Sequence, residues 1–335
     1  MPIRVLLFLA AGAAALCLAL VIVLVSPQVR AGPPPPVTAR DAATLRDTGG
    51  DLTLTMRAVD GVGIVEARPS GGGAGARPLA ASPDGETVAV STVEPGQTGP
   101  LTLVRDDGSQ LEVALPGVWG AAFEPGGAWL AVVDLSGAMW QVDVITGAAV
   151  RLGDGPYGPD PTVLRDGRIL AVRLSAVDAP IWAAAETLDP KSGDAAPVGS
   201  VAAEDQLVYG ATALTDGSFL LVQHEIGGGV SLVQHRPDGT EATLTDLAGA
   251  ASVAVSPDGR WRSWPEAGVT WLAEMDAGSL PVRIGAGSLA RFSPDASLLM
   301  LFDPESTDVF DLTGARVTRV GPAACWLGDG RGCRP

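Results

Sequence analysis

A four-residue turn recurs along this chain and constrains its fold more than any other feature of the sequence. Ser82–Gly85 reads Ser-Pro-Asp-Gly, Ser256–Gly259 repeats it, and Ser293–Ala296 repeats it with Ala in the last place. Pro holds φ at about −65° in such a turn, Asp bonds to the backbone that follows it, and Gly accepts the left-handed conformation. Because an apolar run precedes each copy and a strand-like run follows it, each copy predicts a β-hairpin.

Looser copies of the same turn make it an internal repeat. The last residues of successive copies lie about 34 to 50 residues apart, and a period of about 40 residues is typical of a four-stranded propeller blade. The longest interval requires an insertion, which we place at residues 189–194. The looser copies are Glu124–Gly127, Arg165–Gly167, Thr215–Gly217 and Leu327–Gly330.

The second unit of the repeat shows the pattern of one blade most clearly. Its strand-like runs cover residues 121–123, 129–133, 139–144 and 149–152, with a turn after each of the first three. This pattern of a Ser-Pro-Asp-Gly turn, an apolar strand and an Asp-containing strand that ends in Gly resembles the WD-repeat-like and TolB-like propeller repeats. The resemblance covers about residues 50–335 and implies an all-β propeller. It leaves the function open, because propellers host many unrelated activities.

The two ends of the repeat region complement each other. Residues 51–57 and 62–67 form strand-like runs with no inner strand before them, whereas residues 323–327 form an inner strand with nothing after it. Joining both ends completes one blade and closes the ring without open sheet edges. We therefore predict a seven-bladed propeller over residues 51–335 whose last blade is shared between the chain ends, with six or eight blades as alternatives.

The N-terminal segment predicts export. Val5–Val25 carries no charge and is long enough to span a bilayer, so residues 1–26 are predicted to be a transmembrane signal anchor. The alternative is a cleaved signal peptide, for which residues 29–31 supply a cleavage site. Residues 27–50 are predicted to be a Pro-rich linker. The expected location is the cell membrane with an extracytoplasmic C-terminal domain, or secretion if the signal is cleaved.

Charge and cysteine content narrow the partners and the compartment. The formal net charge of −16 repels phosphate backbones, so we expect no nucleic-acid partner. Cys325 and Cys333 in an exported domain predict a disulfide. The loop between them is short, so the chain-entropy model assigns this bond about 2.5 kcal/mol of stabilisation.

Signatures of catalysis and of metal binding are missing from the sequence. There is no Gly-x-Ser-x-Gly elbow and no zinc-ligand or calcium-loop spacing. The two histidines, His224 and His235, end neighbouring strand-like runs and are predicted to be surface residues, since a metal site would need further ligands. We expect no metal and no cofactor, and the sequence favours a protein that is not an enzyme without deciding the point.

Three residues share one offset from the recurrent turn. Arg77, Trp119 and Tyr209 each lie eight residues before the last residue of a turn copy. The offset predicts that they lie where the chain begins its inner strands, at one rim of the central channel. Two aromatic residues and an arginine at a rim are typical of a ligand-binding mouth. The alternative is ordinary packing of rim residues.

Acidic residues occupy the loop between the second and third strands of every unit. Glu94, Asp134 and Glu266 are the candidate ligand-binding acids, and this loop opens on the face that carries the predicted rim. A negative field there would attract a basic partner, although acids are also common in turns for local reasons. The remaining members of this set are Asp60, Asp178, Glu225, Asp303 and Glu305.

These observations favour a non-catalytic binding or scaffold propeller that engages a protein or cell-envelope ligand. The alternative is an enzyme, a hydrolase or lyase, with its site in the central channel. A cluster of acids, histidine or arginine in the channel would favour the enzyme. The alanine-containing inner runs at residues 121–123, 211–213 and 253–255 favour an apolar channel and hence the binding protein.

Overall fold

The computed structural model divides the chain into residues 1–36 and 37–335, and every residue described below belongs to the second unit. The predicted signal anchor at residues 1–26 lies outside the described residues. Within the described part of the chain, no helix has the length and apolarity that a membrane span requires. The structure describes residues 43–47, 50–69, 75–93, 100–176, 183–199, 206–225, 230–246, 253–275, 278–286, 289–303, 306–321 and 323–327.

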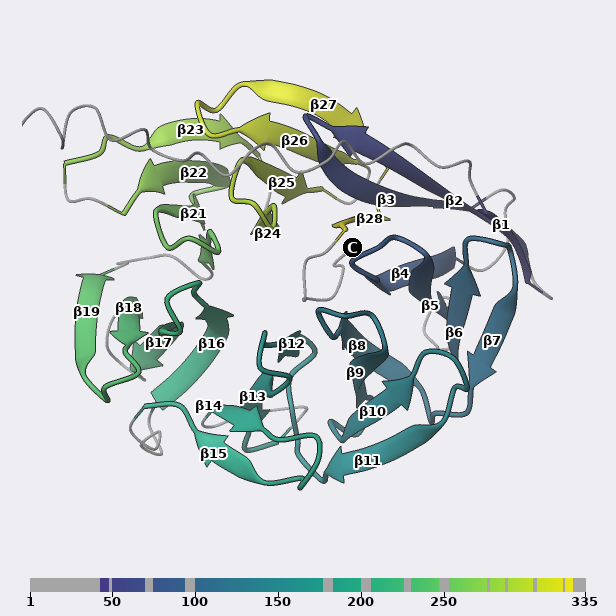
Figure 1. Ribbon diagram of the computed structural model, residues 1–335. Helices are drawn as coiled ribbons and strands as arrows, with labels where there is room; N and C mark the ends of the chain where they lie inside the picture. Colours follow the sequence, from purple (N-terminus) through teal and green to yellow (C-terminus); the bar gives the residue numbers. More distant parts are fainter. Residues whose placement is uncertain are drawn as a thin grey trace, which may run out of the picture. The chain divides into compact units, whose positions relative to one another are not determined.

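The described residues form a seven-bladed β-propeller and contain no helix, which confirms the predicted all-β fold. The strands pair into seven four-stranded antiparallel sheets, and these follow one another as blades around a ring in Figure 1. The strands are β1 (Ala43–Asp47), β2 (Gly50–Val59), β3 (Val62–Pro69), β4 (Gly75–Ala81), β5 (Thr87–Val93), β6 (Leu101–Arg105), β7 (Gln110–Val113), β8 (Val118–Phe123), β9 (Trp129–Asp134), β10 (Met139–Asp143), β11 (Ala149–Gly153), β12 (Thr162–Val163), β13 (Ile169–Leu174), β14 (Ala183–Leu188), β15 (Ala195–Pro197), β16 (Gln206–Ala213), β17 (Phe219–Glu225), β18 (Val230–His235), β19 (Glu241–Asp246), β20 (Ala254–Val255), β21 (Trp261–Glu266), β22 (Val269–Glu274), β23 (Val282–Gly285), β24 (Leu289–Phe292), β25 (Leu298–Phe302), β26 (Thr307–Asp311), β27 (Arg316–Val320) and β28 (Ala323–Trp326).

One blade is built from both ends of the propeller. Its strand order is β1-β2-β3-β28, and β28 pairs with β3 so that Trp326 lies opposite Ile64. The outer strand β1 begins at Ala43, inside the range that the sequence assigned to the linker, so the strands begin earlier than residue 51. An outer strand buries little apolar surface, and its sequence therefore carries a weak pattern.

The recurrent turns connect each inner strand to the second strand of its blade. Between β4 and β5, the Ser82 hydroxyl donates to the Asp84 carboxylate at 2.6 Å, and the Thr87 amide donates to the Ser82 hydroxyl at 2.9 Å. Gly85 closes the turn with a left-handed φ of 74°. The turns that begin at Ser256 and Ser293 repeat the serine–aspartate bond at 2.6 Å. The sequence motif therefore encodes a self-contained hydrogen-bonded hairpin.

Apolar packing between neighbouring blades forms the core. The described residues hold seven buried clusters, and each cluster draws its side chains from two blades that are adjacent in the ring. In β25, Leu298 and Met300 belong to one cluster while Leu299 and Leu301 belong to the next. Successive strand residues point to opposite faces of a sheet, so both faces of the strand are buried. This explains why the second strands read as continuous apolar runs.

Cys325 lies on the closing strand and is 5% exposed. It packs with Leu54 and Val65 of the shared blade and with residues of the following blade. Its sulfur is disulfide-bonded. Cys333 lies outside the described residues, so the pairing of Cys325 with Cys333 stays a prediction.

Trp326 is the side chain with which we test ring closure. It is 2% exposed, it packs against the β25 face of the neighbouring blade, and its indole nitrogen donates to the Arg291 carbonyl at 3.2 Å. We expect Trp326→Ala to lower the free energy of unfolding by about 3–5 kcal/mol, because it leaves a large cavity at the junction of the two chain ends. Denaturant unfolding measures this loss. Leu280→Ala, at a side chain that is 86% exposed, is the control and should stay within about 0.5 kcal/mol. Equal unfolding curves for the two variants would contradict closure through Trp326.

Candidate functional site

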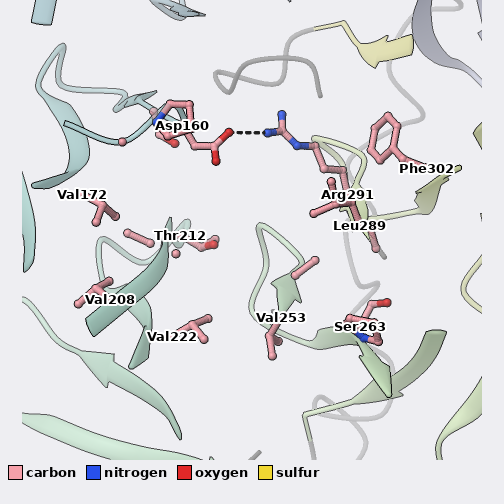
Figure 2. Close-up of a pocket in the computed structure, with 18 of the residues that line it drawn as sticks. Asp160, Val172, Val208, Thr212, Val222, Val253, Ser263, Leu289, Arg291 and Phe302 are labelled. Carbon is pink, nitrogen blue, oxygen red and sulfur yellow. Dashed lines mark hydrogen bonds and ion pairs between the residues drawn. The ribbon is translucent and has the colours of Figure 1, made fainter. Parts of the chain in front are cut away.

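A cavity of about 290 Å³ opens in the central channel between four blades. Its walls come from β12, β16, β20 and β24 with their neighbouring strands, and Figure 2 shows their side chains converging on the open space. Most of the walls are apolar, but an acid, an arginine and several hydroxyl groups are also present. The apolar members include Val172, Val208, Val222, Val253, Leu289 and Phe302, and the polar members include Asp160, Thr212, Ser263 and Arg291.

Asp160 and Arg291 form an ion pair across this cavity. The Arg291 Nη2 donates to Asp160 Oδ1 at 3.3 Å, and their side chains are 12% and 36% exposed for the arginine and the acid respectively. The two residues are the only charged members of the cavity lining among the described residues. They are 131 positions apart in the sequence, and two complete blades lie between their sheets in the ring. The propeller therefore brings together two charges that the sequence leaves unrelated.

The segment between β11 and β12 places Asp160. Two backbone hydrogen bonds hold this segment between its neighbouring blades. The Tyr157 amide donates to the Gly137 carbonyl at 2.8 Å, and the Gly158 amide donates to the Val172 carbonyl at 2.8 Å. The Pro159 carbonyl oxygen then lies directly over Gly120 of β8, where a Cβ atom would overlap it. Gly120 follows a β-bulge in β8. The close approach of the two backbones thus sets the position of the acid.

The inner strand β24 places Arg291. Arg291 lies opposite Met300 of β25, and its carbonyl accepts the hydrogen bond from the Trp326 indole. In Figure 2 its guanidinium extends away from the strand toward Asp160, beside Leu289 and Phe302. The backbone of Arg291 is therefore bonded to the closing strand β28, whose pairing with β3 completes the ring.

Ser263 supplies an unused hydroxyl group at the wall of the cavity. The residue lies on β21, is 1% exposed, and its Oγ has no hydrogen-bond partner among the described residues. A buried hydroxyl group without a partner costs free energy, so a ligand oxygen is a suitable partner for it. A serine in a strand gives no signal in the sequence, and sequence reasoning missed this residue together with Asp160 and Arg291.

The three predicted rim residues do not share one position. Trp119 and Tyr209 are each the extra residue of a β-bulge in β8 and β16, whereas in β4 the extra residue is Leu79 and not Arg77. The side chain of Trp119 is half-buried and packs on the cluster between the β8–β11 and β12–β15 blades. The side chains of Arg77 and Tyr209 lie outside the described residues. A ligand role for the three stays a prediction, and for Trp119 the packing role is the one observed.

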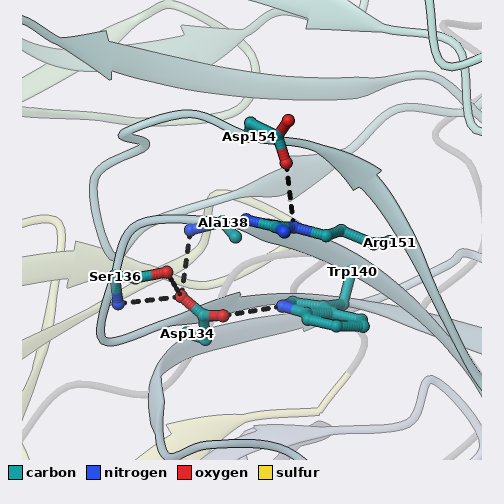
Figure 3. A network of polar contacts seen from close by, with 6 residues as sticks. All are labelled: Asp134, Ser136, Ala138, Trp140, Arg151 and Asp154. Carbon is teal, nitrogen blue, oxygen red and sulfur yellow. Dashed lines mark hydrogen bonds and ion pairs between the residues drawn. The ribbon is translucent and has the colours of Figure 1, made fainter.

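Asp134 is a buried turn residue and not an exposed ligand-binding acid. It is 2% exposed, and its carboxylate accepts hydrogen bonds from the Ser136 hydroxyl at 2.6 Å, the Ala138 amide at 3.0 Å and the Trp140 indole at 2.8 Å. Figure 3 shows this network below the Arg151–Asp154 ion pair. Burial by itself would raise the pKa of Asp134, but the hydrogen bonds from Ser136 and Trp140 outweigh it and lower the pKa.

The structure describes one of the other two candidate ligand-binding acids. Glu266 is exposed at the end of β21, beside Ala267 with its left-handed φ of 50°. Glu94 lies outside the described residues. Because Asp134 is turned inward, the predicted acidic face loses one of its three candidate ligand-binding acids, and a basic partner at this face stays a prediction.

His235 is buried, which contradicts the predicted surface position. It is 5% exposed, its Nδ1 lies 3.0 Å from a Glu241 carboxylate oxygen, and its ring fills the space beside Gly199. The segment that carries Gly199 covers the ring, which the sequence could not show. His224 is half-buried at the end of β17. Among the described residues, no three His, Cys, Asp or Glu side chains are grouped closely enough to hold a metal ion.

Comparisons with known proteins show the fold of the chain and not its family. A scan against protein-family models finds no match, and a search of curated proteins finds none. Solved structures do match. An oligogalacturonate lyase in complex with manganese has a TM-score of 0.57 at 12% identity, covering 83% of this chain and 85% of that chain. The tricorn protease has a TM-score of 0.58 at 13% identity, covering 88% of this chain and 35% of that chain. TolB from Acinetobacter baumannii has a TM-score of 0.49 at 14% identity, covering 85% and 82%.

These findings correct the expectation of a non-catalytic binding or scaffold protein. The solved propellers with this fold include a lyase, which agrees with the alternative expectation of an enzyme. The channel also differs from the apolar, alanine-lined one that the inner strands suggested, because Asp160 and Arg291 face each other inside it. The inner strands were a poor guide, since Asp160 lies in the segment that precedes its strand.

Two glycines at matched positions test how Asp160 is placed. Gly120 and Gly210 both follow a bulge in an inner strand, but a Cβ would overlap the Pro159 carbonyl at Gly120 and would meet nothing within 4 Å at Gly210. We expect Gly120→Ala to lower the free energy of unfolding by about 1–3 kcal/mol through overpacking. Gly210→Ala, the control, should leave it unchanged or raise it. Denaturant unfolding of both variants measures the difference, and equal stabilities would contradict the close approach.

The pH dependence of stability tests the role of Asp134. Its folded pKa is lowered, so its ionised form stabilises the protein above the unfolded pKa, and this contribution is lost as pH falls through the folded pKa. We expect Asp134→Asn to cost about 1–3 kcal/mol at neutral pH and to approach the parent in acid. Asp107→Asn, in an exposed turn of similar bonding, should show a weaker pH dependence. Unfolding curves across pH measure this, and a constant deficit of Asp134→Asn at every pH would argue against the ionised network.

Proposed function

We propose that the central channel is the active site of an enzyme, a hydrolase or lyase, that acts on a small substrate carrying a carboxylate. The observation that carries the proposal is the Asp160–Arg291 pair facing across a cavity of about 290 Å³. The resemblance to a propeller that is a lyase of oligogalacturonate supports this reaction class. The exposure of Asp160 keeps one side of the pair accessible to a ligand in the channel.

In this proposal, Arg291 recognises the carboxylate of the substrate. A guanidinium presents a planar fork of donors that matches a carboxylate with two parallel hydrogen bonds. A substrate carboxylate that binds Arg291 replaces Asp160 as its partner. Asp160 then lies beside the bound substrate with a carboxylate oxygen in position to accept a proton. The unused Ser263 hydroxyl and the valine-lined walls complete the binding surface.

The acid supplies the proton transfer. In an elimination, Asp160 takes the proton from the carbon next to the substrate carboxylate. The electron pair of the broken carbon–hydrogen bond forms a double bond to the adjacent carbon, and the bond between that adjacent carbon and the leaving oxygen breaks. The leaving oxygen is protonated by solvent, and Arg291 balances the charge that builds on the substrate carboxylate. In a hydrolysis, Asp160 instead takes a proton from the water that attacks the ester or glycosidic carbon. The bond between that carbon and the leaving oxygen breaks, and solvent protonates the leaving oxygen. Both reactions use the same two residues in the same roles.

A resident metal does not fit the described lining. Mn²⁺ prefers several oxygen or imidazole ligands, and the lining supplies one carboxylate and no histidine among its described residues. We therefore assign no step to a metal.

We also propose a cellular location for the propeller, based on its N-terminal segment. We place the propeller outside the cytoplasmic membrane, anchored by the apolar run Val5–Val25 or released if that run is cleaved. A disulfide between Cys325 and Cys333 fits this compartment. The Ser-Pro-Asp-Gly repeat supports assignment to the TolB-like propellers. Cell fractionation tests the location, and recovery of the chain only in the cytoplasm would contradict it.

Turnover of acidic oligosaccharides and of small carboxylate-bearing esters tests the activity. A lyase yields a product with a new absorbing double bond, whereas a hydrolase yields new reducing ends or free acids. We expect Asp160→Asn to lower kcat by about 100-fold or more, and Arg291→Lys to lower kcat/KM by about 10-fold or more through loss of the two-bond contact. Arg283→Lys, at an exposed residue of β23, is the control.

Two outcomes would contradict this proposal. Activity that survives the combined Asp160→Asn and Arg291→Lys substitutions in folded protein would place the chemistry elsewhere. A parent protein that turns over none of the carboxylate substrates would remove the enzymatic function itself. Thermal unfolding of each variant shows whether a loss of activity reflects loss of the fold.

A further inference from the structure

The opposite end of the central channel holds a second cavity, of about 460 Å³, which the proposed function does not use. It lies on the face that carries the recurrent turns, and six blades contribute to its lining. The residue two positions before the last residue of each turn copy reaches the cavity. These positions are Pro83, Pro125, Arg165, Thr215, Pro257 and Pro294. Four proline rings therefore surround the mouth, and Arg165 is the single charged residue in the set.

The remaining walls of this cavity are largely apolar. Phe123, Leu214 and Phe219 line it together with the proline rings. Cavities of about 300–1,000 Å³ with apolar walls and a few polar groups are typical of small-molecule sites. Thr162 lines both this cavity and the one at Asp160, so the two are successive parts of one channel with different chemistry at each end.

The charges of the lining leave one arginine without an acidic partner among the described residues. Arg168 and Asp166 neutralise each other, since Arg168 Nε donates to Asp166 Oδ2 at 2.8 Å and Nη2 lies 2.7 Å from the same oxygen. Arg165 is exposed, and no ion pair joins it to an acid in the part of the chain that the structure describes. With two arginines and one aspartate, the lining is positive in a chain whose net charge is −16.

The neighbouring turn aspartates do not cancel this charge inside the cavity. Asp84, Asp258 and Asp295 each accept a hydrogen bond at 2.6 Å from the serine of their own turn. None of the three belongs to the cavity lining. Their carboxylates are directed into their own turns, which leaves the guanidinium of Arg165 as the charge that a ligand in the cavity meets first.

We propose that this cavity is a second binding site, for a small apolar anion such as an aromatic or acyl carboxylate or sulfonate. The guanidinium of Arg165 binds the anionic group through charge-assisted hydrogen bonds, and the proline and phenylalanine rings pack against the apolar part of the ligand. The site is distinct from the Asp160–Arg291 pair, because neither of these two residues lines it and it lies on the face that carries the recurrent turns.

Titration calorimetry of the full chain with the aromatic sulfonate ANS tests this site. We expect one molecule to bind, Arg165→Gln to weaken binding by about 10-fold or more, and Arg165→Glu to abolish it, because a charge-assisted bond is lost and then reversed. Arg260→Gln and Arg260→Glu are matched controls. Arg260 directly follows the turn at Ser256–Gly259, is exposed, does not line the cavity and undergoes the same change of charge. Near-ultraviolet circular dichroism verifies native packing, since loosely packed states also bind ANS.

The outcomes separate this site from the proposed active site. Binding that responds to Arg165 and not to Arg291→Lys supports a second site at the turn face. Binding that responds to Arg291→Lys and not to Arg165→Gln places the anion at the other end of the channel and overturns the inference. Equal losses in Arg165→Glu and Arg260→Glu reveal a long-range charge effect and no site, and absence of ANS binding by the parent also overturns it.

Discussion

Burial of apolar surface between neighbouring blades is the interaction on which this structure depends. Both faces of the second strands are apolar, as the alternation of Leu298–Phe302 between two clusters shows. A blade alone can cover neither face, so each blade requires one neighbour on each side. The requirement can be met for every blade only if the ring closes, and β28 closes it by pairing with β3. Ring closure is therefore a condition for the stability of all seven sheets.

The geometry of the candidate active site depends on this closure of the ring. Asp160 is positioned by the backbone contact between Pro159 and Gly120, which belongs to the junction of two blades. Arg291 is positioned by β24, whose backbone also accepts the hydrogen bond of the closing residue Trp326. The two charges meet across the channel because the ring has a fixed size. Loosening either junction changes their separation, which links the stability of the ring to the chemistry proposed for its channel.

The repeated turns and strands determine the shape of the propeller, whereas residues that depart from the repeat form its candidate sites. The turn serines and aspartates satisfy one another in the same way in three blades, so they stabilise hairpins and leave little for a ligand. Arg165 occurs where most copies have proline, and it makes one mouth of the channel positive. Asp160 lies in the irregular segment before the short strand β12, in the third unit. Residues that break a structural repeat without weakening the fold are the ones available for binding and catalysis.

The sequence by itself determined the blade architecture, because a turn with its own hydrogen bonds and apolar runs at a fixed spacing are local signals. It predicted the shared blade from two incomplete chain ends, but missed β1, whose outer position requires little apolar pattern. The tertiary structure alone decided that Asp134 is turned inward, since four donors surround its carboxylate only in the folded turn. It alone decided that Asp160 meets Arg291 and that Ser263 has no partner among the described residues. Such contacts join residues far apart in the chain, and a lone acid, arginine or serine has no local pattern that reveals its partner.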